Sequence, residues 1–580
     1  SYFLLQFHIN YDGKPMKLKL QINNVIQEAF VKAGIEHEPM SVSESTKPEF
    51  GDFQFNGAMA LSKRLGKNPR EIATQLIENL DLTGVLAKAE IAGPGFINLW
   101  LNPFWLASQC ELARKDARLG VEKRETPIKV VVDYSGPNMA KQMHVGHLRS
   151  SIIGDTLANL LTYLGDEVIR QNHIGDWGTQ FGMLIAYLEE IHEDGSVSLK
   201  DLEQFYKDAK GRFDADEDFA NKAREYVVKI QSGDSHCLEL WQKFIDISLG
   251  HCEEVYEKLG VNLTRDDVRA ESFYNDDLIS VVSDLEAKGI LTQSDGAQCV
   301  FLEGDEVPVI VQKGDGGYLY ATTDLAALRY RAQTLGAQRI SYVVDARQGG
   351  HFKQVFRVAK EAGFVSPEVK LEHIAFGTMM DKGGKPFKTR EGGTVKLIEL
   401  LDEAIVKAKE TINDKESYSP EELEVLAKII GIGAVKYADL SINRESNYIF
   451  NWDKMLSFEG NTSLYMQYAY ARIQSIFRKH DGPIEGNIII GDALEHRLST
   501  MLLRFEDVLN RAAGDASPNQ ITTYLYDLVT LFMRFYEQNP ILKEGVVEAT
   551  KQSRLALADL TAKTIKQGLD ILGIETVDKL

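Results

Sequence analysis

A short run of valines, followed by a glycine-containing loop and a leucine-rich helix, constrains the fold of this chain most strongly. Residues 128–134 include three consecutive valines, and such a run is typical of a strand buried on both faces of a parallel sheet. Apolar side chains then recur at helical spacing over residues 148–164, and a second strand begins at Val168. This order predicts a βαβ unit, from which nucleotide-binding sheets are built.

The N-terminal part of the chain is expected to form a separate domain, because 580 residues exceed the length of one ordinary domain. A charged run at 122–125 followed by Pro127 marks a boundary, so residues 16–125 are predicted to be an N-terminal α/β domain. Residues 1–15 are interpreted as a leader or an added extension, because the chain starts with Ser1 and Met16 is a plausible native start. They lack the basic start and cleavage site of a signal peptide, so a signal peptide is not predicted.

The sheet domain is predicted to cover residues 126–396 and to carry a charged, mostly helical insertion at about 187–305. The parallel sheet is expected to resume after it, in apolar runs at 307–311, 340–344 and 374–376. Residues 397–580 show an almost continuous helical pattern and predict an all-α C-terminal domain.

Composition narrows the possible classes of protein. The net charge of −20 argues against an extended basic surface for nucleic acid but permits local basic and aromatic patches. Four cysteines without Cys-x-x-Cys spacing give no sign of a zinc or redox site, so no protein-held metal is expected. The chain has no run of 18 apolar residues, so no membrane span is predicted. The few cysteines favour a reducing, cytoplasmic compartment.

The segment His144-Val145-Gly146-His147 is the strongest local signal for chemistry, because it lies between the first strand and the start of the following helix. A helix N-terminus attracts phosphate, and a glycine there lets a ligand approach the backbone closely. Two imidazoles on one turn can donate hydrogen bonds to a phosphate that gains charge during adenylyl transfer. The alternative is a pair of surface histidines that only cap the helix.

A second signal is a basic, glycine-flanked loop at residues 384–393, which contains Lys385 and Lys388. Lysines on such a loop could close over a triphosphate and its leaving pyrophosphate, although many loops of this composition are only solvated turns. The chain has no Gly-x-x-x-x-Gly-Lys-Ser/Thr loop, so a P-loop ATPase is not supported.

These two segments resemble the two signatures of class I aminoacyl-tRNA synthetases, the second in a degenerate form in which Pro386 and Phe387 depart from the Lys-Met-Ser-Lys-Ser pattern and Thr389 replaces a serine. The resemblance narrows to the bacterial type of arginyl-tRNA synthetase and covers almost the whole chain from Met16. It rests on segments 50–54, 92–98, 133–141, 172–178, 318–324, 433–437 and 465–470.

The fold that this resemblance implies is α/β. It comprises a Rossmann-like class I catalytic domain with a helical insertion, an N-terminal α/β domain that contacts tRNA, and a C-terminal all-α domain that binds the anticodon. The implied reaction is activation of L-arginine with ATP, followed by transfer of the arginyl group to the terminal 2′-OH of tRNA(Arg), with release of AMP and pyrophosphate.

The resemblance also implies which residues hold the amino acid: Asp133, Asn138, Tyr320, Asp324 and Gln348. A guanidinium is planar and always charged, so a selective pocket needs carboxylates that accept its N–H groups. We therefore expect Asp133 and Asp324 to receive the substrate side chain. The alternatives are a loop or capping role for Asp133 and an N-cap role for Asp324.

The implied catalytic residues surround the phosphates and are His144, His147, Lys141, Lys385 and Lys388. ATP is expected to contact both histidines, both loop lysines, Gly146 and His351, with Mg²⁺ on the phosphates. No protein nucleophile is needed, because the carboxylate of arginine attacks the α-phosphate directly.

The implied contacts with tRNA lie at the two ends of the chain and comprise Phe53, Asn56, Tyr465, Tyr468, Arg472 and Tyr536. Tyr465, Tyr468 and Arg472 share one helix face, and aromatic and guanidinium planes are surfaces on which unstacked bases lie. The alternatives are a buried core stripe for this face and a buried strand position for Phe53.

Three other functions remain open from the residues themselves. A nucleotidylyltransferase would share the histidines and the sheet, but would not need an aromatic helical tail. A class I synthetase for another amino acid would lack the two carboxylates, and a non-catalytic tRNA-binding relative would have lost the histidines and lysines. We expect an arginine–tRNA ligase with L-arginine, ATP and tRNA(Arg) as partners, no membrane contact and a monomeric state.

Overall fold

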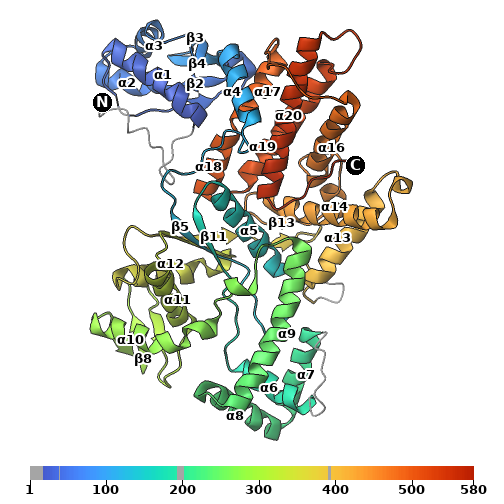
Figure 1. Cartoon of the computed structure of the whole chain (residues 1–580). Coiled ribbons are helices and arrows are strands. Elements are labelled where there is room, and N and C mark those ends of the chain that lie inside the picture. The colour runs from blue at the N-terminus through green and yellow to red at the C-terminus, as the bar shows by residue number, and fades with distance from the viewer. Residues whose placement is uncertain (1–16, 38, 192–200, 389–392) are drawn as a thin grey trace. The chain divides into compact units, whose positions relative to one another are not determined.

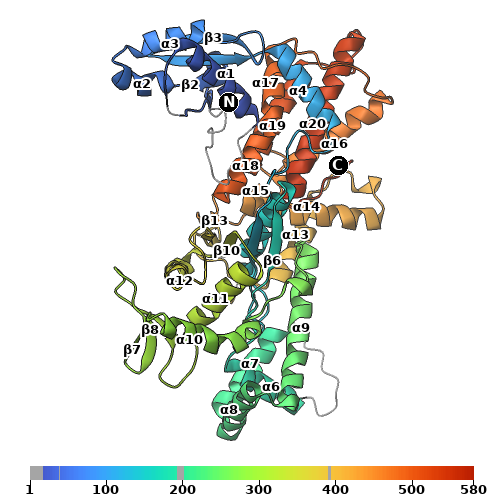
Figure 2. The same cartoon turned by 60° about the vertical axis from the view of Figure 1, so that its left-hand side comes forward.

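The chain forms two compact units. The computed structural model describes residues 17–37, 39–191, 201–388 and 393–580, so the predicted leader at 1–15 lies outside the described residues. One unit combines the N-terminal part up to Glu125 with the C-terminal part from Met455, and the other runs from Thr126 to Lys454. Figures 1 and 2 show the first unit in blue and in orange to red, and the second in the colours between them.

A four-stranded parallel sheet forms the centre of the second unit, in the order β11-β10-β5-β6. Its strands are β5 (Lys129–Asp133), β6 (Glu167–Gln171), β10 (Arg339–Asp345) and β11 (Lys370–Phe376). The three valines of β5 are fully buried, as expected for a central strand of a parallel sheet. Helix α5 (Leu148–Tyr163) connects β5 to β6, so the predicted βαβ unit is confirmed.

The α/β class is confirmed, but one predicted strand belongs elsewhere. The apolar run at 307–311 was expected in the parallel sheet, whereas β9 (Val309–Gln312) pairs antiparallel with β8 (Ala297–Val300). Together with β7 (Leu291–Ser294) they form a separate three-stranded sheet. The runs at 340–344 and 374–376 do lie in β10 and β11, as predicted. A buried apolar run alone does not distinguish these two environments.

The insertion is helical over its first part. Helices α6 (Gln180–Ile191), α7 (Leu202–Ala215), α8 (Glu217–Ser232) and α9 (Ser235–Leu259) pack on one another. Short 3-10 turns and α10 (Leu278–Ala287) follow, before the three-stranded sheet. Helices α11 (Tyr320–Arg329) and α12 (Gly349–Glu361) then flank the returning strand β10.

The boundary expected between residues 396 and 397 does not separate the two compact units. Helices α13 (Leu397–Thr411) and α14 (Pro420–Leu440) contact α9 and α5 respectively, and the second unit extends to Lys454. The short strands β12 (Met379–Met380) and β13 (Tyr448–Ile449) pair in parallel within this unit. A helical pattern identifies a helix but not the unit against which it packs.

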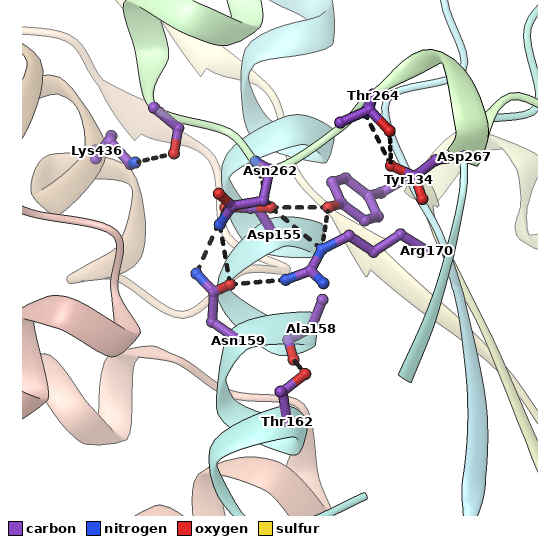
Figure 3. Close-up of polar contacts among 11 residues, drawn as sticks. Tyr134, Asp155, Ala158, Asn159, Thr162, Arg170, Asn262, Thr264, Asp267 and Lys436 are labelled. Carbon is purple, nitrogen blue, oxygen red and sulfur yellow. Dashed lines mark hydrogen bonds and ion pairs between the residues drawn. The ribbon is translucent and has the colours of Figure 1, made fainter. Parts of the chain in front are cut away.

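A polar network connects the sheet, α5 and the end of the insertion (Figure 3). The Tyr134 hydroxyl donates to the carboxylate of Asp155 over 2.8 Å, and the same carboxylate accepts the backbone N–H of Asn262. Arg170 on β6 donates to the Tyr134 oxygen and to Asn159. Because each of these groups is paired, the network orders the chain immediately after β5, where the candidate site begins.

The first unit contains an N-terminal α/β part. Its antiparallel sheet has the order β1-β2-β4-β3, with strands β1 (Ser43–Glu44), β2 (Phe53–Phe55), β3 (Leu86–Ala92) and β4 (Phe96–Leu101). Helices α1 (Lys17–Ala33), α2 (Gly57–Leu65), α3 (Pro69–Glu78) and α4 (Pro103–Lys115) accompany it. Leu99, Ile72 and Phe30 are fully buried in their common core.

The C-terminal part of this unit is helical, as predicted. Short helix α15 (Trp452–Met455) leads to α16 (Ser463–His480), α17 (Ala493–Leu503), α18 (Phe505–Asp515), α19 (Asn519–Gln538) and α20 (Glu548–Ile571). Helices α17 and α20 also contact α4 of the N-terminal part. Among the described residues, no helix is both long enough and apolar enough to cross a membrane.

Gly154 on α5 is predicted to be essential for packing against the sheet. A Cβ atom there would lie 2.2 Å from the Cβ of buried Tyr134, so Gly154→Ala should lower the free energy of unfolding by roughly 1–3 kcal/mol. Gly250→Ala on α9 is the control, because nothing lies within 4 Å of its Cβ position, and it should be neutral or stabilising. Thermal unfolding of both variants measures the difference, and equal melting temperatures would contradict this packing.

Candidate active site

The two histidines lie at the carboxyl end of β5, where the chain enters α5. The backbone N–H of Gly146 donates to His144 Nδ1 over 3.0 Å, and the backbone N–H of His144 donates to His147 Nδ1 over 3.2 Å. The ring centroids are 4.4 Å apart. Since each Nδ1 accepts a hydrogen bond, each neutral ring carries its proton on Nε2.

The electrostatic surroundings keep both rings neutral. Burial, and then the charge of Lys141, lowers the pKa of His144 below its ordinary value of 6.5. Burial, and then His144 itself, lowers the pKa of His147 to about 3. The pair therefore offers two neutral N–H donors beside a helix N-terminus, which suits an anionic oxygen better than a metal ion.

The lysines predicted to contact phosphate are accessible. Lys141 is exposed and its Nζ lies 5.2 Å from the ring centroid of Tyr206 on α7. Lys385 and Lys388 are exposed on the segment that follows β12. The carboxylate of Asp381 accepts the backbone N–H groups of Gly383 and Lys385, which forms a tight turn. Thr389 and the next three residues lie outside the described part of the chain.

A second cluster in this unit is acidic. Asp324 on α11 forms an ion pair with His351 at the start of α12, with 2.5 Å between Oδ2 and Nε2. This hydrogen bond raises the pKa of His351 above its ordinary value of 6.5. Helix α11 begins at Tyr320, so Asp324 lies inside the helix and does not cap it, which excludes the capping alternative.

Glu271 is a member of this cluster that the sequence reasoning missed. Burial, and then the charges of Asp176 and Asp324, raise its pKa to about 8. The backbone N–H of Trp177 donates to it, and within the described residues no basic side chain pairs with it. A half-buried carboxyl beside two carboxylates favours the binding of a cation.

The structure places Asp133 differently from our expectation. It is the last residue of β5, and its Oδ2 lies 2.8 Å from Nη2 of Arg331, a fully buried guanidinium. The ring of Tyr342 lies 5.1 Å from the same guanidinium. Asp133 is therefore paired with an internal arginine, whereas Asp324 is paired with His351 and is a charged neighbour of Glu271.

The other residues predicted to contact the amino acid have the following positions. Tyr320 is 72% exposed on the first turn of α11, four residues before Asp324 and on the same face. Asn138 accepts the backbone N–H of Ala140 and bridges to Gly175. Gln348 is exposed at the end of the short turn that follows β10. Asn138 and Gln348 follow the parallel strands β5 and β10, at the edge where such sheets bind ligands.

The predicted contacts with tRNA lie in the first unit. Tyr468 and Arg472 on α16 meet Tyr536 on α19, because Arg472 donates to the Tyr468 hydroxyl over 3.0 Å and lies 5.2 Å from the Tyr536 ring centroid. Arg472 is exposed, and both tyrosines are half-buried. The ring centroid of Tyr465, one turn earlier on α16, lies 6.2 Å from that of Tyr526 on α19. This face combines aromatic planes with a guanidinium at the surface.

Phe53 does not fit its predicted role. Its side chain is fully buried in the core of the N-terminal part, with 0% solvent exposure, so RNA does not reach it in this fold. The alternative of a buried strand residue is the one that the structure supports. Asn56 is exposed at the position preceding α2, and its side chain caps no helical N–H.

Comparison with protein families defines the class to which this fold and site belong. Residues 110–452 match the family described as tRNA synthetases class I (R), catalytic domain, and the chain therefore contains the catalytic domain of a class I aminoacyl-tRNA synthetase. Residues 16–101 match the arginyl tRNA synthetase N terminal domain, and residues 466–580 match the DALR anticodon binding domain. The chain belongs to the arginyl-tRNA synthetases, which are arginine–tRNA ligases.

Similar proteins match over the full length. The chain is 53% identical to the arginine–tRNA ligase of Alteromonas mediterranea and 54% identical to that of Laribacter hongkongensis; each match covers 97% of this chain and all of the relative. The crystal structure of arginyl-tRNA synthetase from Plasmodium falciparum is 30% identical, with a TM-score of 0.86, over 97% of this chain and 99% of that one. The arginyl-tRNA synthetase of Thermus thermophilus, at 23% identity and a TM-score of 0.82, shares the fold.

The protonation of the two types of histidine provides a test of the site. The imidazole signal of His147 should not titrate between pH 5 and 8, because its pKa is about 3, whereas that of His351 should titrate above pH 6.5. Histidine-labelled protein can be followed by NMR, with His147→Asn and His351→Asn used to assign the signals. A titration of His147 near pH 6.5 would contradict the neutral donor pair.

Proposed function

We propose that this arginine–tRNA ligase recognises the guanidinium of L-arginine through Glu271 and Asp324. The observation that carries this proposal is the half-buried carboxyl of Glu271, which pairs with no basic side chain among the described residues and whose pKa burial, and then the neighbouring acids, raise to about 8. A guanidinium placed between two carboxylates would form charge-assisted hydrogen bonds with both. It would also remove the like-charge repulsion that the empty pocket contains.

The surrounding residues complete the amino-acid site in this proposal. Tyr320 lies on the same face of α11 as Asp324 and closes over the substrate side chain, while Asn138 and Gln348 hold its α-amino and carboxylate groups. His351 orients Asp324 through their ion pair. In this proposal Asp133 holds the buried Arg331 in place by an ion pair and does not contact the substrate.

We further propose that the phosphate chemistry belongs to His144, His147, Lys141, Lys385 and Lys388, with Gly146 leaving room for ATP and His351 at the edge of the ATP site. The arginine carboxylate attacks the α-phosphate of ATP, and the bond to pyrophosphate breaks. The two Nε2–H groups stabilise charge on the phosphate oxygens without transferring a proton. The lysines balance the charge of the leaving pyrophosphate.

Several finer assignments belong to the same proposal. Mg²⁺ accompanies the ATP phosphates, since the described residues contain no cluster of three or more acidic, histidine or cysteine side chains that could hold an ion on their own; chelation with EDTA tests its need. Residues 16–125 contact the tRNA, and the helices that follow Lys454 bind its anticodon. The protein acts as a monomer in the cytoplasm, and sedimentation tests the monomeric state.

The guanidinium pocket predicts selective effects on arginine. Glu271→Gln and Asp324→Asn should each raise the KM for arginine roughly 10- to 100-fold and change the KM for ATP far less, because each removes a charge-assisted hydrogen bond. In the unaltered protein the KM for arginine should fall as pH rises from 6.5 to 8.5, since Glu271 ionises near pH 8, and this dependence should disappear in Glu271→Gln. Pyrophosphate exchange measures all these constants.

Asp133→Asn is the matched comparison. It leaves the buried guanidinium of Arg331 unpaired, so it should lower the free energy of unfolding by about 3–5 kcal/mol while the folded protein keeps its KM for arginine. Equal increases in the KM values for arginine and ATP in Glu271→Gln would overturn the proposed pocket. A raised KM for arginine in Asp133→Asn, without loss of stability, would instead indicate that Asp133 contacts the substrate guanidinium.

The face around Arg472 predicts a loss that is confined to tRNA. Arg472→Gln should raise the KM for tRNA about tenfold in aminoacylation and leave the KM for ATP unchanged, because stacking on a base is worth about 1–3 kcal/mol. Arg478→Gln on the same helix is the control, since it removes the same charge from a side chain that binds the carbonyl of Asp578. An equal change in both variants would indicate general electrostatic attraction only.

A further inference from the structure

Arg149 is buried in the first turn of α5, two residues after His147, and only 2% of its surface is exposed. Its Nε donates to the carboxylate of Asp439, 3.2 Å from Oδ2. Its Nη1 donates to two backbone carbonyls, those of Gly377 at 2.9 Å and Ser446 at 3.0 Å. One guanidinium therefore joins three segments that are distant in the sequence.

The partners of Arg149 are themselves tightly packed. The Asp439 side chain on α14 has no solvent exposure, and it also accepts the hydroxyl of Tyr448 over 3.3 Å. The ring of Tyr448 lies 5.1 Å from the guanidinium of Arg149. A Cβ atom on Gly377 would lie 2.6 Å from the backbone of Ser446, so only glycine permits this close approach. We call Arg149, Gly377, Asp439, Ser446 and Tyr448 the Arg149 joint.

The Arg149 joint is directly continuous with the segment that carries the loop lysines. Tyr448 on β13 is opposite Met379 on β12, and the Tyr448 N–H donates to the carbonyl of Thr378 over 3.2 Å. The chain leaves β12 at Met380 and enters the turn that the Asp381 carboxylate holds, which ends at Lys385. The orientation of this turn therefore depends on where β12 and β13 are fixed.

We propose that Arg149 is a positioning residue that holds the base of the Lys385–Lys388 segment at a fixed distance from His144 and His147, so that both can act on one triphosphate. The fork of a guanidinium can bind a carboxylate and two carbonyls at once, whereas a lysine provides one point charge. Misplacement of a catalytic group by about 1 Å can cost roughly a hundredfold in rate. The inference rests on the proposed phosphate roles of these residues.

The test compares Arg149→Lys and Tyr448→Phe with a control elsewhere in the same unit. In pyrophosphate exchange with tRNA present, Arg149→Lys should lower kcat roughly 10- to 100-fold and leave the KM for arginine within about twofold. Tyr448→Phe keeps the ring and removes one hydroxyl, so it should lower kcat less. In the double variant, the loss should be smaller than the product of the single losses, because the two residues act through one contact.

Glu372→Gln is the control for a merely structural role. It breaks the buried ion pair with Arg339 at the amino ends of β10 and β11, away from the loop, and should lower the melting temperature without lowering kcat. Three results would overturn the proposal: normal kcat in folded Arg149→Lys, an equal loss of kcat in Glu372→Gln, or single losses that multiply in the double variant. Lys385→Met distinguishes a failure of the proposed phosphate role from a failure of the Arg149 joint. If it leaves kcat unchanged, the proposed phosphate role fails, whereas a low kcat there with normal Arg149→Lys overturns only the joint.

Discussion

The parallel alignment of the four strands of the central sheet is the constraint on which the rest of the second unit depends. Because β5, β10 and β11 run in the same direction, their carboxyl ends meet along one edge. The histidines follow β5, Gln348 and His351 follow β10, and the Lys385–Lys388 segment follows β11. Segments that are far apart in the chain therefore lie at one edge of the sheet, the edge at which sheets of this kind bind ligands.

The charged groups inside this unit are arranged in two different ways. The arginines form ion pairs within the protein, whereas Glu271 has acidic neighbours. Arg149 and Arg331 each have a carboxylate partner from the protein itself, Asp439 and Asp133, and all four groups are buried. Glu271 has acids for neighbours and lacks such a partner within the described residues. Its raised pKa leaves this carboxyl largely protonated near neutral pH, and a cation placed beside it would favour the ionised form, which is the basis of the proposed guanidinium pocket.

Local features of the sequence predicted the elements that depend on local periodicity. The strand with three valines, helix α5 and the histidine turn were all identified, because burial and helix caps leave patterns within a few residues. The run at 307–311 was assigned to the wrong sheet, since an apolar run does not reveal its neighbours. The ion pair of Asp133 could not be predicted from the sequence, because its partner, Arg331, lies almost 200 residues later in the chain. Glu271 lies in a charged stretch whose pattern gives no sign that it folds inward.

The hydrogen bonds on Nδ1 of the two histidines have a consequence for how this site can change over time. Their partners are the main-chain N–H groups of Gly146 and His144, not side chains. The path of the backbone therefore determines that each imidazole carries its proton on Nε2. Replacement of neighbouring side chains should leave this tautomer unchanged, because both donors in these hydrogen bonds are backbone groups. Mutational drift around the site can alter its shape and charge while the polarity of its two donors stays the same.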